Sequence, residues 1–223
     1  MGKFVDLTAS DGHKFAAFVS QPAGKARGGV VVIPEIFGIN SHIQQVTDGF
    51  AADGYVAVAP AMFDRVQKNY DTGYSQPEIQ AGVAVMQKLD AKQSMMDVQA
   101  SIAEAAKGGK VGIVGYCFGG TIAWMAAARA TGLACAVPYY GGGMHGLISE
   151  KPRIPVMCNF GETDHSPTLA QAKEIAAAHP EIAAHFYPGA GHGFNCDQRG
   201  SWNAEAAKLA RSRTIEFFRK HLG

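Results

Sequence analysis

The sequence contains little cysteine, and its cysteines follow no pairing pattern. Cys117, Cys135, Cys158 and Cys196 are the only four in 223 residues, and they form neither a C-x-x-C motif nor a set with histidines at zinc spacing. This excludes a disulfide-stapled secreted module and the common structural zinc domains. We therefore expect a thiol-reduced, cytoplasmic protein with no metal and no other cofactor.

The sequence also lacks an excess of charge and any long apolar run. Its formal net charge is +1, so it offers no basic surface for nucleic acid or an anionic membrane. No apolar stretch approaches the length of a membrane span, and the first residues show no signal-peptide pattern. No helical pattern opens behind the glycines at 141–143, which excludes a nucleotide-binding fingerprint there. A small molecule remains as the expected partner of a monomeric protein.

Short apolar runs alternate with longer helical patterns along the chain, which predicts an α/β fold with a mainly parallel central sheet and helices on both faces. The first two runs, at 4–7 and 15–19, flank Asp11-Gly12 and predict an N-terminal hairpin. Further strands are expected at 29–33, 55–59, 111–114, 133–139, 155–160 and 184–187, and helices at 40–52, 77–89, 95–107, 118–130, 169–178 and 202–222. Neither a linker nor a repeat interrupts the pattern, so residues 1–223 are expected to form a single domain.

The segment Gly115-Tyr116-Cys117-Phe118-Gly119 joins a β-branched run to an Ala-rich helical pattern. This is the context of a nucleophile elbow, G-x-S-x-G, with cysteine in the place of serine. The glycines are needed because bulkier side chains at those positions would collide with the strand or the helix. The amides that begin the helix favour a thiolate. We therefore predict that Cys117 is a nucleophile rather than an inert buried thiol.

An acid and a base follow Cys117 in the order that α/β-hydrolases use. Asp164 lies in the loop after the strand expected at 155–160, and His192 lies between two glycines after the strand expected at 184–187. Loops at the carboxyl ends of parallel strands meet at one edge of the sheet, where the active sites of open α/β sheets collect. Asp164 is predicted to orient His192, and His192 to exchange a proton with the thiol.

The oxyanion that forms when a nucleophile attacks a carbonyl group requires two hydrogen-bond donors. The backbone N–H of Phe118 is expected to be the first, and that of Ile36 or Phe37, in the loop after the strand at 29–33, the second. Glu35 lies in the same loop, where a carboxylate would repel the charge that this loop has to stabilise.

At this point the chain resembles the dienelactone hydrolase family. The segments I-P-E-I-F-G, G-Y-C-F-G-G, G-E-T-D and G-A-G-H-G-F-N match the blocks of that family in order and span nearly the whole chain. The resemblance implies an α/β-hydrolase fold and the hydrolysis of lactones or esters. It assigns Cys117, Asp164 and His192 to the catalytic triad, and Glu35 to the glutamate that partners the resting thiol.

The sequence departs from this family where a substrate carboxylate would bind. By the resemblance, two arginines hold that group, one before the elbow and one four residues after the triad histidine. No arginine lies between Arg65 and Arg129, and the second position holds Cys196, with Arg199 displaced from it. We therefore expect neutral lactones, aryl esters or thioesters as substrates. The loop residues expected to line an apolar pocket are Phe37, Phe63, Tyr70, Tyr74, Tyr140, Met144 and Phe194.

Two other functions fit parts of the pattern. A non-catalytic α/β-hydrolase scaffold could bind a small ligand in the same pocket, although a binding protein needs no nucleophile, base, acid and oxyanion loop together. A thiol redox sensor could use Cys117 with Cys196 as the resolving cysteine, although no resolving cysteine is adjacent in the sequence. Steady-state hydrolysis of a simple aryl ester is expected only of an esterase, and it therefore distinguishes an esterase from these two alternatives.

Overall fold

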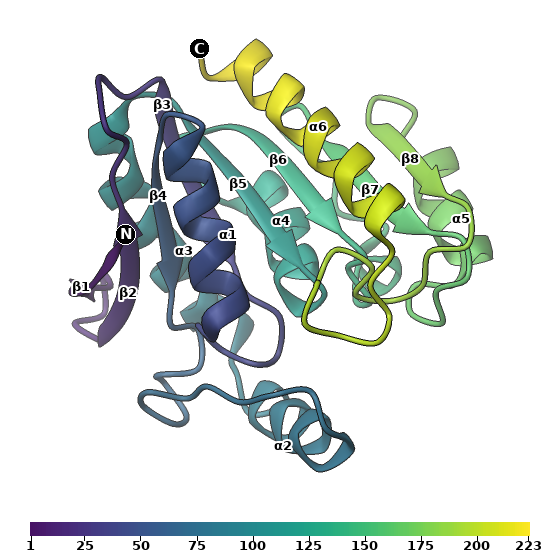
Figure 1. Ribbon diagram of the computed structural model, residues 1–223, viewed down its shortest axis with the longest axis horizontal. Coiled ribbons are helices and arrows are strands. Elements are labelled where there is room, and N and C mark those ends of the chain that lie inside the picture. The colour runs from purple at the N-terminus through teal and green to yellow at the C-terminus, as the bar shows by residue number, and fades with distance from the viewer.

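The computed structural model describes residues 1–223 and contains one eight-stranded sheet in the order β1-β2-β4-β3-β5-β6-β7-β8 (Figure 1). The first two strands form the expected antiparallel hairpin, β2 runs antiparallel to β4, and the remaining neighbours are parallel. The strands are β1 (Lys3–Thr8), β2 (Lys14–Ser20), β3 (Gly28–Ile33), β4 (Tyr55–Pro60), β5 (Val111–Tyr116), β6 (Leu133–Tyr139), β7 (Met157–Gly161) and β8 (Ala183–Tyr187). The predicted α/β-hydrolase fold is confirmed.

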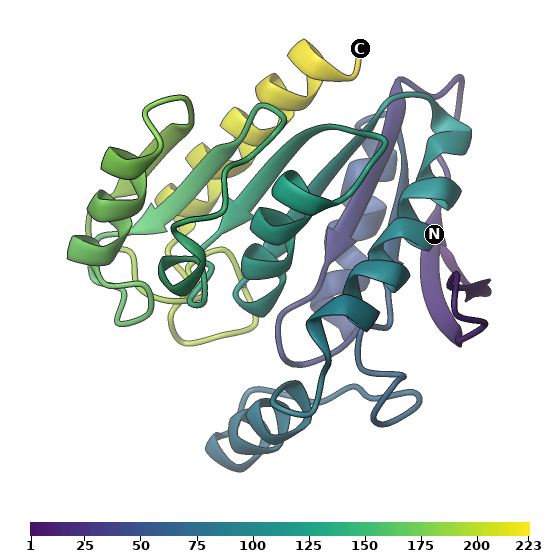
Figure 2. The same cartoon turned by 180° about the vertical axis from the view of Figure 1, so that it is seen from behind.

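Helices cover both faces of the sheet, as expected. Two of them, α1 and α6, lie in front of the strands in Figure 1, and three others, α3, α4 and α5, cover the opposite face in Figure 2. The helices are α1 (Ser41–Ala52), α2 (Gln76–Met86), α3 (Ala91–Ala105), α4 (Phe118–Arg129), α5 (Leu169–Ala178) and α6 (Ala204–His221). None of them is both long and apolar enough to cross a membrane.

Alternate residues of the central strands supply two separate apolar layers. In β3, Val31 and Ile33 pack in the layer under α3, α4 and α5, whereas Val30 and Val32 pack in the layer under α1 and α6. All four side chains are fully buried. A strand that is apolar on both faces is typical of a sheet buried between helices, and it explains the continuous run of valines in the sequence.

Several helix boundaries differ from the predicted ones because capping residues decide where a helix begins. Helix α3 starts at Ala91, four residues before the predicted Met95, because the carboxylate of Asp90 accepts a hydrogen bond from the backbone N–H of Gln93. Asn203 caps α6 in the same way. These shifts leave the order of the elements unchanged.

The carboxyl ends of the parallel strands meet at the lower edge of the sheet in Figure 1. Helix α2 stands below this edge, apart from the two helical layers, and packs only sparsely on the other elements. The long connection between β4 and α2 runs over the same edge. The loops that carry Glu35, Cys117, Asp164 and His192 all lie there, because each follows the carboxyl end of a parallel strand.

Candidate active site

Cys117 occupies a strained turn between β5 and α4. Its backbone has φ 56° and ψ −116°, a conformation that residues with a side chain rarely adopt. The turn is tight, since a Cβ atom on Gly115 would lie 1.9 Å from the carbonyl oxygen of Gly119. The thiol is partly exposed, whereas Cys135 and Cys158 are fully buried. The strand, turn and helix predicted around Cys117 are therefore all present, and they bring its thiol to a cavity.

His192 and Asp164 meet at the carboxyl ends of β8 and β7. Nδ1 of His192 lies 3.1 Å from each carboxylate oxygen of Asp164 and donates a hydrogen bond to that carboxylate. Asp164 is 6% exposed, and its Oδ1 also accepts a hydrogen bond of 2.8 Å from the backbone N–H of Ser166. The buried carboxylate thus fixes the orientation and the tautomer of the imidazole. Two other ionisable residues lie next to Asp164 in the same loop, but His165 is exposed and Glu162 makes no contact of this kind.

The protonated form of His192 is favoured in the folded protein. Burial lowers the pKa of His192, but the interactions of its ring with Asp164 and with the neighbouring Cys117 outweigh burial and raise the pKa to about 10. The imidazole therefore carries a proton at neutral pH. A positive charge beside the sulfur stabilises a thiolate, and the same proton can pass to a leaving group.

Glu35 is buried in the loop after β3 and pairs with Arg199. It is 1% exposed, and its Oε1 lies 3.0 Å from Nη1 of Arg199. The guanidinium carbon of Arg199 lies 5.3 Å from the ring centroid of Phe37 and 5.7 Å from that of Tyr74. The ion pair is thus held against two aromatic rings, and its arginine lines the cavity that contains Cys117.

Arg199 lies at the site although it does not occupy the sequence position that the family resemblance predicts for an arginine. The segment after His192 winds in turns of three residues, with hydrogen bonds from Cys196 N to Gly193 O (3.0 Å) and from Arg199 N to Cys196 O (3.2 Å). Residues three apart lie on the same side of such a turn. Arg199 therefore lies on the same side of the loop as position 196, where the resemblance places an arginine. Residue spacing alone does not reveal this, because it does not show how the loop turns.

The cavity at this edge has a volume of about 550 Å³, which suits a small organic molecule. Cys117 and His192 lie on its wall together with Phe118 and Ile36, whose backbone N–H groups are the expected oxyanion donors. The lining residues are Ile36, Phe37, Gln76, Ile79, Val83, Met86, Cys117, Phe118, Thr121, Gly142, Gly143, His165, Ser166, His192 and Arg199.

Of the seven residues expected to line the pocket, only Phe37 lines this cavity. The prediction was wrong for the other six. The six that do not line it are Phe63, Tyr70, Tyr74, Tyr140, Met144 and Phe194. Tyr140, Met144 and Phe194 are completely buried in the two apolar layers. Tyr74 packs behind Arg199, where its hydroxyl accepts hydrogen bonds from Asn40 and Cys196. Large apolar side chains near a buried sheet edge gain more from the core than from a wet cavity.

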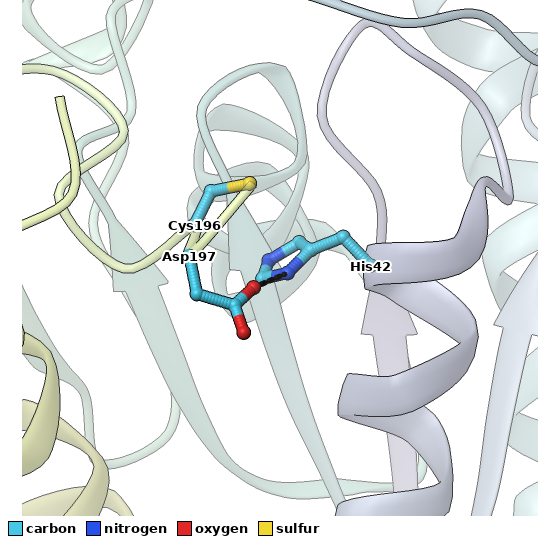
Figure 3. A group of neighbouring side chains, drawn as sticks. All are labelled: His42, Cys196 and Asp197. Carbon is cyan, nitrogen blue, oxygen red and sulfur yellow. Dashed lines mark hydrogen bonds and ion pairs between the residues drawn. The ribbon is translucent and has the colours of Figure 1, made fainter. Parts of the chain in front are cut away.

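A second group of side chains has the composition of a metal site. His42, Cys196 and Asp197 bring their ligand atoms within 4.8 Å of one another (Figure 3). Asp197 Oδ1 lies 3.1 Å from Nδ1 of His42, and Sγ of Cys196 donates a 3.3 Å hydrogen bond to Tyr74. Burial raises the pKa of the Cys196 thiol to about 11, which disfavours the thiolate that a metal ion needs. In the structure this group joins the loop that carries Arg199 to the start of α1.

Comparison with known proteins places these features in one family. The family model of the dienelactone hydrolase family matches residues 15–222. A putative carboxymethylenebutenolidase of Synechocystis is 34% identical over 94% of this chain and 93% of that protein. The carboxymethylenebutenolidase of Pseudomonas putida is 32% identical over 96% of this chain and 94% of its own length.

A solved structure agrees with the sequence relatives. The crystal structure of a putative dienelactone hydrolase from Klebsiella pneumoniae superposes with a TM-score of 0.83 at 27% identity, covering 97% of this chain and 98% of the other. The family match and the relatives together span nearly the whole chain. The protein therefore belongs to the dienelactone hydrolase family.

Proposed function

We propose that the protein hydrolyses small lactones or carboxylic esters through an acyl-enzyme on Cys117. As a member of the dienelactone hydrolase family it is a hydrolase of this class, and relatives such as the Pseudomonas putida protein are named carboxymethylenebutenolidase. One observation supports the mechanism: a partly exposed cysteine on a strained turn lines the same cavity as an imidazole that a buried carboxylate holds.

In the proposed reaction, the proton of the Cys117 thiol passes to Glu35, Sγ attacks the carbonyl carbon, and the backbone N–H groups of Phe118 and Ile36 stabilise the oxyanion. The carbon–oxygen bond of the ester then breaks, and the proton on His192 passes to the leaving alkoxide. Water attacks the resulting thioester, His192 takes one proton of that water, and the carboxylic acid leaves as Sγ is released and takes its proton back from Glu35. Asp164 stabilises the imidazolium at each step without itself accepting the proton.

The proposal is tested by trapping the acyl-enzyme. Rapid acid quenching during turnover of 4-nitrophenyl acetate is expected to leave one acetyl group on the peptide that contains Cys117, as measured by mass spectrometry. A burst of one equivalent of 4-nitrophenolate should accompany it if deacylation is slower than acylation. Steady turnover with acetyl groups on other residues, and none on Cys117, would exclude the thiol as nucleophile.

Glu35 is proposed to control the state of the resting thiol. A carboxylate close to the sulfur disfavours a thiolate, which protects the thiol from oxidation in the free enzyme. In the structure the carboxylate is held by Arg199, so a movement of Glu35 towards the sulfur has to break this ion pair. A bound substrate that disturbs the pair would release Glu35 to take the thiol proton.

We expect Glu35→Gln to lower kcat more than it changes the rate at which a mild electrophile alkylates Cys117 in the free enzyme. The amide cannot accept the thiol proton when substrate binds, whereas the resting thiol loses only a nearby anion. The two rates are measured by ester turnover and by iodoacetamide labelling of the Cys117 peptide. Equal losses in both measurements would show that Glu35 acts on the resting thiol alone.

A further inference from the structure

Helix α2 presents an apolar face to the active-site cavity rather than to a core. Ile79, Val83 and Met86 follow one another at helical spacing, so they lie on one side of the helix, and all three line the cavity. They are half-buried, and none of them belongs to either apolar layer of the sheet. Their exposed hydrocarbon therefore faces the space beside Cys117.

The position of α2 relative to the reacting groups is set by a close backbone contact. A Cβ atom on Gly82 would lie 2.6 Å from the carbonyl oxygen of Ile36, so only glycine lets the helix approach the oxyanion loop this closely. Gly82 is itself buried. Because Val83 follows Gly82 directly, the middle of the apolar face lies next to the loop whose N–H group is proposed to hold the oxyanion.

Helix α2 itself supplies no cation to the cavity. Glu78 is the only charged residue of the helix, and its carboxylate accepts hydrogen bonds from the backbone N–H groups of Ser75 (2.8 Å) and Gly73 (3.2 Å). Arg199 is the only arginine or lysine on the cavity wall, and it is paired with Glu35. A carboxylate placed against α2 would therefore lose its water without gaining a partner from the helix, which is strongly unfavourable.

We propose that α2 forms the subsite for an uncharged, apolar alkyl or aryl group of the substrate. The inference rests on the proposed ester hydrolysis and narrows its substrate class to apolar esters and lactones. The face from Ile79 to Met86 extends about 10 Å along the helix at 1.5 Å per residue, which matches an alkyl chain of up to about eight carbons. Specificity then comes from hydrocarbon contacts with the helix rather than from recognition of an anion.

The first test compares kcat/KM for 4-nitrophenyl acetate, butanoate, hexanoate and hemiglutarate. Each added methylene that is buried against α2 is expected to raise kcat/KM about two- to fourfold, so hexanoate should exceed acetate by at least about tenfold. The hemiglutarate, whose chain ends in a carboxylate, should fall below butanoate by about tenfold or more. A rate that does not change with chain length, or a preference for hemiglutarate, would overturn the proposal.

Variants of α2 test whether the dependence of kcat/KM on chain length comes from this helix. Val83→Ser is expected to lower the hexanoate-to-acetate ratio at least about threefold, because a hydroxyl replaces hydrocarbon. Ala84→Ser is the matched control, since Ala84 is the neighbouring, exposed residue of the same helix. Met86→Arg should raise the hemiglutarate-to-butanoate ratio about tenfold or more by supplying the missing cation. An equal change in the Ala84→Ser and Val83→Ser ratios would contradict a specific subsite.

A binding measurement separates this inference from the proposed reaction. Hexanamide and acetamide are titrated against Cys117→Ala, which cannot form an acyl-enzyme, and binding is followed by ligand-observed NMR. Hexanamide is expected to bind at least about tenfold more tightly than acetamide, and Val83→Ser in the same background should reduce the difference. If esters are not hydrolysed but this preference is found, the subsite stands and the proposed reaction fails. If acetate is hydrolysed through Cys117 but the preference is missing, the subsite fails and the reaction stands.

Discussion

In the Cys117→Ala variant we expect kcat/KM for 4-nitrophenyl acetate to fall by about 10⁴-fold or more. Removing the nucleophile of a covalent mechanism leaves only the oxyanion donors and substrate binding, which account for a small part of the rate. Alanine fits the turn at Cys117 as well as cysteine does, so the fold should persist. The loss is measured by steady-state hydrolysis, and circular dichroism shows whether the variant is folded.

Cys135→Ala is the matched control for this experiment. Cys135 is fully buried in β6, and burial raises the pKa of its thiol to about 12, so it is protonated and inaccessible to substrate. Its removal should change kcat/KM by about twofold or less, at a cost in stability of about 1 kcal/mol for the small cavity. Turnover that survives in Cys117→Ala would indicate a different nucleophile, and tight ligand binding without turnover in the wild type would indicate a binding scaffold.

The positions of the proposed reacting groups can be predicted from the sequence because they follow from chain topology. Cys117, Asp164 and His192 each come directly after a buried strand, and parallel strands end at one edge whatever the details of their packing. The structure places Asp164 and His192 in contact and puts Cys117 and His192 on one cavity wall. Pattern and topology together therefore suffice to locate the candidate triad.

The walls of the cavity are harder to predict, because they depend on which way a loop side chain turns. Tyr140 and Phe194 lie within two residues of site loops, yet both are packed inside with no exposed surface. Ile79, Val83 and Met86 of α2 contribute apolar surface to the cavity instead. The sequence pattern of this helix does not differ from that of other amphipathic helices. Periodicity shows that this helix has an apolar side, but not that the side faces a cavity instead of a core.

The same limit applies to Arg199. The family resemblance points to a fixed position in the sequence, whereas the structure brings an arginine to the cavity from one turn later along the loop. Gly193 makes this possible: its φ is 76°, and a Cβ atom there would lie 2.3 Å from Nη1 of Arg199. Glycine thus leaves room for the guanidinium to reach Glu35. An arginine that reaches the cavity from a different position in the sequence is missed when only one fixed spacing is considered.

Replacing Gly115 by alanine is expected to lower the free energy of unfolding by about 3 kcal/mol or more. The added Cβ would lie 1.9 Å from the carbonyl oxygen of Gly119 and 3.0 Å from the backbone nitrogen of Gly120. Both are backbone atoms of the turn and of α4, so no flexible side chain can move aside, and the helix has to shift as a unit. Urea unfolding followed by circular dichroism measures the loss.

Gly24→Ala provides the control, because a Cβ atom at Gly24 would meet nothing within 4 Å. Its stability should change by about 0.5 kcal/mol or less, or rise slightly as the unfolded chain loses freedom. The activity per folded molecule of Gly115→Ala should also be lower than that of the wild type. A shift of α4 moves both Cys117 and the N–H of Phe118 relative to His192. If Gly115→Ala were as stable and as active as Gly24→Ala, the tight turn that presents the sulfur to the imidazole would not be a requirement of this site.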